Sequence, residues 1–288
     1  MPEKDSASGG KGYGVVGALT YRAVSAGLKL SRLPLVGTLI DRMAAQKRLR
    51  VLTIPADGSA GTVTIPVGAA IKSNPAVVPF DAARRLVDGA SYIAATDVCF
   101  CRESHSCRDY PIGLGCLFLG QGARKIGLHG RVHPITKEDA LAHLERARTL
   151  GLITNVIWST TEFHAIGADP RSTVELCSCC PCCCLAFKTR KASRAFIDGI
   201  AGFGISKVVT PVEDCTRCTN CVHVCPFGAI TVDIHRGPSV DPARCKGCGR
   251  CETVCRPGVL KIFPIEPAAR ATPLPGTMYL EEFLEMVK

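Results

Sequence analysis

The chain has 288 residues, of which 18 are cysteine, and 47 % of the residues are hydrophobic. This length and apolar content predict about two folded domains and exclude a wholly disordered chain. The formal net charge is +10, but no aromatic-rich basic strand of the kind that binds RNA occurs, so we expect no nucleic-acid partner. Residues Met1–Gly10 do not resemble a secretory signal, which predicts a reducing, cytoplasmic compartment in which the cysteines bind metal.

Residues 1–50 form an amphipathic basic N-terminal segment. Apolar residues recur at helical spacing between Gly12 and Pro34, and the polar positions carry lysine and arginine. Arg22, Lys29 and Arg32 interrupt the apolar run, so it is too short to span a membrane. Such a helix either contacts an anionic membrane surface peripherally, through residues 11–50 on the inner face of the membrane, or packs against a partner or its own core.

Residues 51–207 alternate between strand and helix signals, which predicts a mixed α/β module rich in cysteine. Residues 208–266 form a compositionally distinct part, and residues 267–288 a linker (Pro267–Pro275) with a C-terminal helix. The fold class is therefore predicted as α+β. The expected elements of the first module are a strand at Thr62–Ile65, a helix at Asp81–Asp88, a strand at Ser91–Val98, a helix capped by Thr136 and Asp139 and ended by Gly151, and a strand at Ile153–Trp158.

Eight cysteines repeat the spacing C-x2-C-x2-C-x3-C twice, which is the pattern of bacterial ferredoxins with two 4Fe-4S clusters. Zinc ribbons also use C-x2-C pairs, but they lack regular third and fourth cysteines at these offsets. The fourth cysteine of each run reaches the other cluster. We therefore assign the first cluster to Cys215, Cys218, Cys221 and Cys255, and the second cluster to Cys245, Cys248, Cys251 and Cys225.

Ten further cysteines are candidate metal ligands for one or two more clusters. Cys99 and Cys101 end a predicted strand on one face, so Cys107 and Cys116 would complete a four-thiolate site. Pro181 suits the first position of a helix, whose N-terminal amides would favour thiolates. Four of the next six cysteines would ligate a further cluster there, and others would be ordinary buried residues. These six are Cys177, Cys179, Cys180, Cys182, Cys183 and Cys184.

Several motifs together resemble a family of multi-cluster 4Fe-4S binding proteins found in anaerobic or redox-versatile microbes. The resemblance covers about residues 77–263 and implies electron transfer through iron–sulfur clusters. It rests on the C-x-C-R segment at Cys99–Arg102, the cysteine and proline at Cys107 and Pro111, the I-T-K-E-D-A-L helix at Ile135–Leu141, the dense stretch Cys177–Cys184 and the two ferredoxin runs at Cys215–Pro257.

We expect an iron–sulfur electron-transfer protein that passes single electrons through three or four 4Fe-4S clusters. Each cluster carries a charge of about −2 when oxidised, which would lower the net charge to about +2 to +4. No flavin or nicotinamide signature occurs, so a partner, such as a flavin- or metal-containing oxidoreductase, would perform two-electron chemistry. The chain would then be a carrier or an electron-transfer subunit of an oxidoreductase. The alternative is a reductase with a catalytic cluster at Cys177–Cys184 acting on a thiol, a disulfide or another small substrate; these cysteines resemble the cysteine-rich motifs of heterodisulfide reductase subunits.

Overall fold

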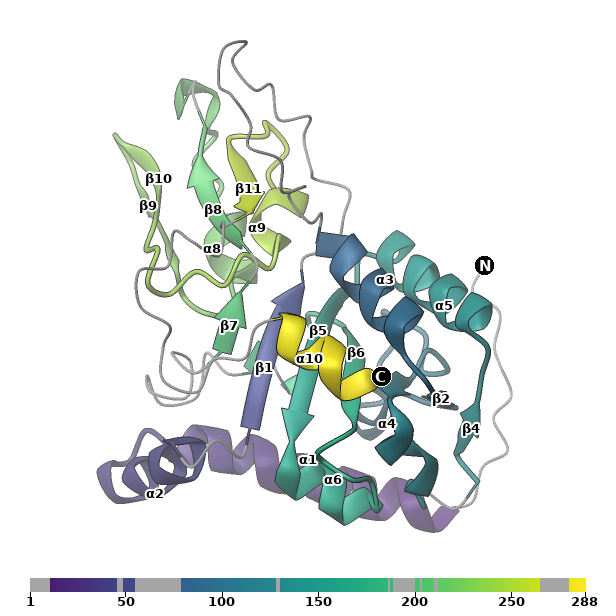
Figure 1. Ribbon diagram of the computed structural model, residues 1–288. Helices are drawn as coiled ribbons and strands as arrows, with labels where there is room; N and C mark the ends of the chain where they lie inside the picture. Colours follow the sequence, from purple (N-terminus) through teal and green to yellow (C-terminus); the bar gives the residue numbers. More distant parts are fainter. Residues whose placement is uncertain are drawn as a thin grey trace.

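Helices and strands are mixed along the chain, in agreement with the predicted α+β class (Figure 1). The computed structural model describes residues 11–45, 49–54, 79–127, 130–185, 187–188, 200–202, 204–209, 212–264 and 280–288. The strand expected at Thr62–Ile65 and the linker Pro267–Pro275 lie outside these residues.

One seven-stranded sheet organises the larger part of the described chain. Its neighbouring strands run antiparallel, apart from the parallel pair β1 and β7. In spatial order the strands are β4 (Val132–Pro134), β2 (Ile93–Thr96), β3 (Cys116–Leu119), β6 (Val174–Cys179), β5 (Ile153–Ser159), β1 (Leu49–Ile54) and β7 (Ile200–Gly202).

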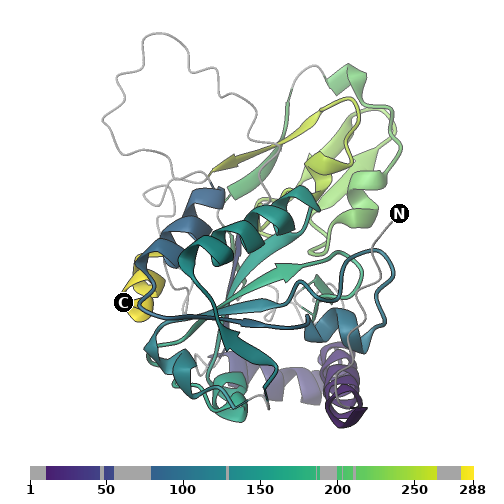
Figure 2. The same cartoon turned by 90° about the vertical axis from the view of Figure 1, so that its right-hand side faces the viewer.

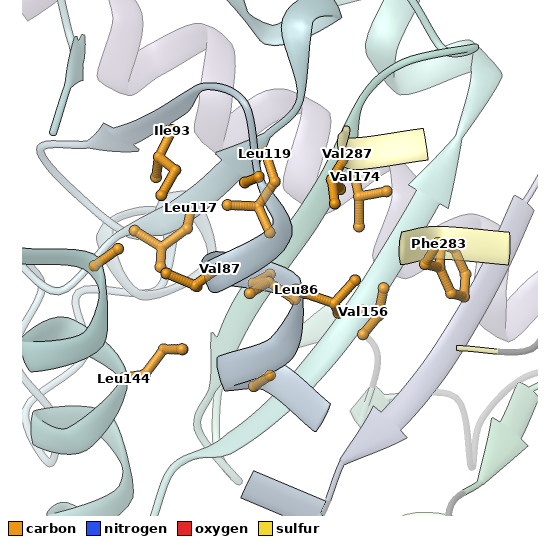
Figure 3. Packing of buried hydrophobic residues seen from close by; sticks show 14 of the residues in the cluster. Leu86, Val87, Ile93, Leu117, Leu119, Leu144, Val156, Val174, Phe283 and Val287 are labelled. Atoms are coloured by element: carbon orange, nitrogen blue, oxygen red, sulfur yellow. The ribbon is translucent and has the colours of Figure 1, made fainter. Parts of the chain in front are cut away.

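One face of this sheet is apolar and carries helices α3 (Pro79–Gly89), α5 (Lys137–Thr149) and α10 (Leu280–Val287). Figure 3 shows the side chains that fill this core between the helices and strands β2, β3, β5 and β6. Because side chains alternate between the faces of a strand, Leu117 and Leu119 of β3 point into this core while Cys116 and Phe118 pack in a different cluster.

The opposite face carries cysteines and polar groups. Helices α1 (Lys11–Leu30) and α4 (Phe100–Ser104) lie on this side, away from α3 and α5 (Figure 2). Helix α6 (Thr160–Ile166) follows β5 and is capped by Ser159, whose hydroxyl accepts a hydrogen bond from the Glu162 amide. The short 3-10 turn η1 (Gln121–Lys125) follows β3.

The C-terminal part is built from two antiparallel strand pairs and short helices. Strand β8 (Gly204–Val208) pairs antiparallel with β11 (Leu260–Pro264), and β9 (Ile230–Asp233) pairs with β10 (Gly237–Val240). Strand β8 therefore pairs within the C-terminal part, although the domain boundary expected at residue 208 cuts through its end. The remaining elements are η3 (Val212–Asp214), α8 (Asn220–Val224) and α9 (Arg250–Thr253).

The N-terminal segment forms two helices where the sequence predicted one. Helix α1 ends at Leu30, and Pro34 starts α2 (Pro34–Ala45). Proline interrupts a helix because it lacks an amide proton, but it is well placed at the first position of the next helix.

Two local predictions around the cysteines were wrong. Cys99 follows β2 and precedes helix α4, which contains Cys101, so these two cysteines do not end a strand. Residues Pro181–Cys183 form a turn and not a helix. In this turn the Cys183 amide donates a hydrogen bond to the sulfur of Cys180 at 3.4 Å. The amide is thus paired with a side chain instead of a backbone carbonyl of a helix.

The C-terminal helix α10 is predicted to be essential for stability. Phe283 is 1 % exposed and packs in the core under α3. Phe283→Ala should lower the free energy of unfolding by about 3–5 kcal/mol, because truncation leaves a cavity. The exposed Glu285→Ala should change it by no more than about 0.5 kcal/mol. Chemical denaturation of both variants checks this, and equal effects would contradict the packing.

Candidate metal centres

Strand β6 and the turn after it supply cysteines to three neighbouring groups. Cys177 and Cys179 lie on one face of β6, and four more cysteines follow between Cys180 and Cys184. Cysteines from other elements contact this segment at three different points. We call the three sets of cysteines the turn group (Cys107, Cys180, Cys182, Cys183), the helix group (Cys99, Cys101, Cys179, Cys184) and the cross-strand pair (Cys116, Cys177).

The turn group gathers four sulfurs within 4.8 Å of one another. The sulfur of Cys182 lies 3.6 Å from those of Cys107 and Cys180, and 3.5 Å from that of Cys183. Burial acts to raise the pKa of Cys107, but the amides of Asp109 and the next residue, with the neighbouring thiols, lower it. Metal binds thiolates, so Cys107 is the most readily available ligand of this group.

The helix group joins α4 to β6. Cys101 lies beside Cys99 and Cys184, and Cys184 in turn lies beside Cys179. Burial acts to raise the pKa of Cys179, but the neighbouring side chains of Cys177, Cys184 and Asn155 lower it to about 7. This group therefore also contains one acidic thiol among neighbours that hold their protons.

The cross-strand pair lies where β3 faces β6. Cys116 and Cys177 are directly opposite in the register, and their sulfurs are 3.2 Å apart. The Cys177 thiol donates to Oε1 of Glu175 at 2.8 Å, and these three residues form a possible metal-binding group. Burial raises the pKa of Glu175, and the nearby Glu175 carboxylate raises the pKa of Glu162.

These contacts differ from the four-thiolate site predicted from Cys99, Cys101, Cys107 and Cys116. The structure distributes the four residues over all three groups. The reason is the antiparallel order β3, β6, β5, which places Cys116 against the start of the dense stretch. The loop that carries Cys107 instead reaches the turn after β6.

The ferredoxin runs bring their cysteines together across the C-terminal part. Cys248 is surrounded by Cys225, Cys245 and Cys251, and the same four residues line one cavity. Cys221 lies beside Cys218 and Cys255, and Cys215 starts the same loop before α8. The fourth cysteine of each run thus lies beside thiols of the other run.

Arg102 stands at the junction of the three N-terminal groups. Its side chain is completely buried; Nη1 donates to the Ser178 carbonyl at 2.7 Å, and Nη2 donates to the Leu114 carbonyl. Burial acts to lower the pKa of Arg102, but thiolates from all three groups raise it. A buried cation is stable only beside compensating negative charge, so the site is suited to an anionic group.

Two buried polar donors beside the thiols have no hydrogen-bond partner in the part of the chain that the structure describes. Among the described residues, Nε of Arg102 and Nδ2 of Asn155 are buried donors without a hydrogen-bond partner. Asn155 is fully buried on β5 beside Cys179. Hydrogen bonds to sulfur are one of the means by which proteins tune iron–sulfur clusters. Both donors therefore fit a cluster held by the surrounding thiolates.

The helix group shares a hydrophobic core with the ferredoxin runs. Cys179 and Cys184 pack in the same core cluster as Cys225, Cys248 and Cys251. Arg250 of α9 lies between the turn group and the ferredoxin cysteines. Burial lowers the pKa of Arg250, and the charges of Cys248, Cys180 and Cys182 act against that change.

Helix α1 covers the turn group. Tyr21 is buried and its hydroxyl donates to the Cys183 carbonyl at 2.7 Å. Its ring lies 6.1 Å from that of His105 and under the Lys188 ammonium. Tyr21, Asn155 and Glu175 were not predicted from the sequence, because nothing in their local sequence marks them. Arg102 was visible within the C-x-C-R segment, but its burial was not.

Comparison with known proteins identifies the C-terminal part. Residues 214–259 match the family model of the 4Fe-4S dicluster domain. Fifty residues are 36 % identical to one of the subunits of the Na(+)-translocating ferredoxin:NAD(+) oxidoreductase complex of Acetobacterium woodii. This match covers 17 % of the chain and 15 % of the relative's length, and no solved structure matches the chain. The chain is thus a multi-cluster 4Fe-4S protein with a dicluster ferredoxin segment.

Arg102→Met should release iron from the N-terminal groups. The substitution removes the buried charge and leaves two carbonyls unsatisfied, which costs about 3–5 kcal/mol for a buried ionic partner. The two clusters of residues 214–259, about eight iron atoms, should remain. The exposed Arg108→Met, next to Cys107, is the matched control and should keep the wild-type iron content. Metal analysis after anaerobic purification checks both, and unchanged iron in Arg102→Met would contradict this role.

Proposed function

We propose that the chain is an electron-transfer protein with four 4Fe-4S clusters in mutual contact. The turn group and the helix group would each hold one cluster, and the eight ferredoxin cysteines would hold two in the crossed assignment given above. The observation that carries this proposal is the shared core of Cys179 and Cys184 with Cys225, Cys248 and Cys251. Each such cluster exchanges one electron at a time.

Both N-terminal groups lie near the second ferredoxin group. The helix group shares a core with Cys225, Cys248 and Cys251, and Arg250 lies between Cys248 and the turn-group residues Cys180 and Cys182. The rings of Phe187 and Phe227 pack edge to face, with their centroids 6.5 Å apart, in the core shared by the helix group and the ferredoxin cysteines. This packing helps to exclude water. Buried surroundings and nearby arginines, here Arg102 and Arg250, set cluster potentials.

The first ferredoxin group is the most accessible to a partner. Cys218 is exposed and Cys215, Cys221 and Cys255 are partly exposed, whereas Cys225, Cys248 and Cys251 are buried. We therefore propose that a redox partner exchanges electrons at this end. The matched relative is named as part of an oxidoreductase complex, which favours an oxidoreductase as the partner.

Metal analysis tests the cluster number. Anaerobically purified protein should contain about sixteen iron and sixteen sulfide per chain. Cys101→Ser and Cys182→Ser should each reduce both numbers by about four, with loss of a different component in low-temperature EPR spectra. His105→Ala, an exposed residue between two cysteines, should keep sixteen. Eight iron in the wild type, or zinc in the N-terminal groups, would contradict the proposal.

We also propose that α1 and α2 attach the protein to an anionic lipid surface. Among the described residues, no helix is long and apolar enough to cross a membrane. Leu19, Leu30, Leu33, Leu35 and Leu39 are nevertheless exposed, and Leu35 is 88 % exposed. The adjacent Arg22, Lys29 and Arg32 are exposed as well, and an apolar surface bordered by cations suits anionic headgroups.

Vesicle flotation tests this attachment. The holoprotein should float with vesicles that contain phosphatidylserine and remain behind with neutral vesicles. Raising the ionic strength from about 0.05 M to about 0.5 M should weaken binding, because the Debye length falls from about 14 Å to about 4 Å. Leu35→Glu should reduce binding at least several-fold, whereas Ile234→Glu, which alters an exposed residue of the C-terminal part, should not. Equal binding of all variants would contradict the attachment.

A further inference from the structure

We propose that Cys116 and Cys177 form a reversible disulfide, an internal two-electron site beside the clusters. The inference rests on the proposed function, since it takes the neighbouring iron–sulfur cluster of the helix group as the electron acceptor and donor. The assignment of ligands leaves these two cysteines over: two groups of four account for the other eight N-terminal cysteines.

The strand register places the two residues in disulfide geometry. Opposite residues of antiparallel strands have Cα atoms about 4.5–5.5 Å apart, within the range of about 4.4–6.8 Å found in disulfides. The sulfurs are already 3.2 Å apart. Neighbouring β3 and β6 residues Leu117 and Leu176 are fully buried, so the strands hold this register firmly.

The backbone around Cys116 fixes its position further. The Cys116 amide donates to Oγ1 of Thr96 at 2.7 Å. Gly115 makes this approach possible, because a Cβ there would lie 2.1 Å from the same oxygen. The backbone of Cys116 is therefore held in place opposite Cys177.

The geometry favours a disulfide over a mononuclear metal site. Two thiolates on one tetrahedral zinc ion lie about 3.8 Å apart, given zinc–sulfur bonds of about 2.3 Å. The sulfurs of the pair are closer than that, and only one further candidate ligand, Glu175, lies within reach among the described residues. A structural zinc site requires four ligands.

The redox step balances within the protein. Oxidation forms the Sγ–Sγ bond and breaks two S–H bonds, so that two electrons and two protons leave. An iron–sulfur cluster held by the helix group would accept and return the electrons one at a time, and Cys179 of that group lies beside Cys177. The protons leave through Glu175, whose carboxylate accepts the hydrogen bond of the Cys177 thiol. Reduction reverses each step.

Cross-link mapping tests the pair in the holoprotein. Oxidised and dithionite-reduced samples are quenched anaerobically in acid with excess maleimide, digested and analysed by mass spectrometry. The peptides of Cys116 and Cys177 should be linked in the oxidised sample and separately alkylated in the reduced one. Cys101→Ser, which should lose a cluster, should still show the link after chemical oxidation.

Electron counting provides the second measurement. Reductive titration of the oxidised wild type should consume about six electrons per chain, four for the clusters and two for the disulfide. The variant C116S/C177S should consume about four and keep all sixteen iron atoms. If that variant fails to fold, the electron count and the cross-link of the wild type still test whether the disulfide forms.

The outcomes separate this inference from the proposed function. A missing cross-link, a wild-type titration that ends at four electrons with sixteen iron present, or loss of iron from C116S/C177S would overturn the inference. One zinc per chain that disappears in C116S/C177S would also overturn it in favour of a metal site. Eight iron in the wild type would instead contradict the proposed function, whatever the cross-link shows.

Discussion

The burial of one guanidinium among thiols is the constraint on which the N-terminal cysteines depend. Arg102 is completely enclosed, and it bonds to the carbonyls of Ser178 and Leu114, which lie next to cysteines on two different segments. The same cation thus positions the cysteine-bearing backbones and compensates the charge that they collect. A buried charge of this kind is unfavourable without its counterpart. In the holoprotein that we propose, the arginine and the clusters would therefore stabilise each other.

Periodicity explains how much of the fold was predictable. The helix capped by Thr136 and the strand beginning at Ile153 follow from local signals, and the structure contains both. The C-terminal helix was equally visible as an amphipathic pattern. The turn at Pro181 was not, because a proline suits either a helix start or a turn, and the choice depends on sulfur contacts made with distant residues.

The site was predictable in composition but not in grouping. The spacing of the ferredoxin runs is a local property, because one loop supplies three ligands to one cluster. The ten other cysteines lie on four separate segments, and their partners follow from strand order. Cys107 lies beside Cys182, and Cys116 lies beside Cys177. Nothing in the local sequence around Cys107 or Cys116 indicates these partners. Asn155 and Glu175 face these sulfurs for the same reason, since both occupy the cysteine-bearing face of the sheet.

The connection between the large sheet and the C-terminal part has a mechanical consequence. Strand β7 ends at Gly202 and β8 begins at Gly204, so a single residue separates a strand of one sheet from a strand of another. A carrier domain that swings on a flexible tether needs many more residues than this. This short connection limits how far the C-terminal part can move away from the large sheet, because no long tether joins the two parts at this point.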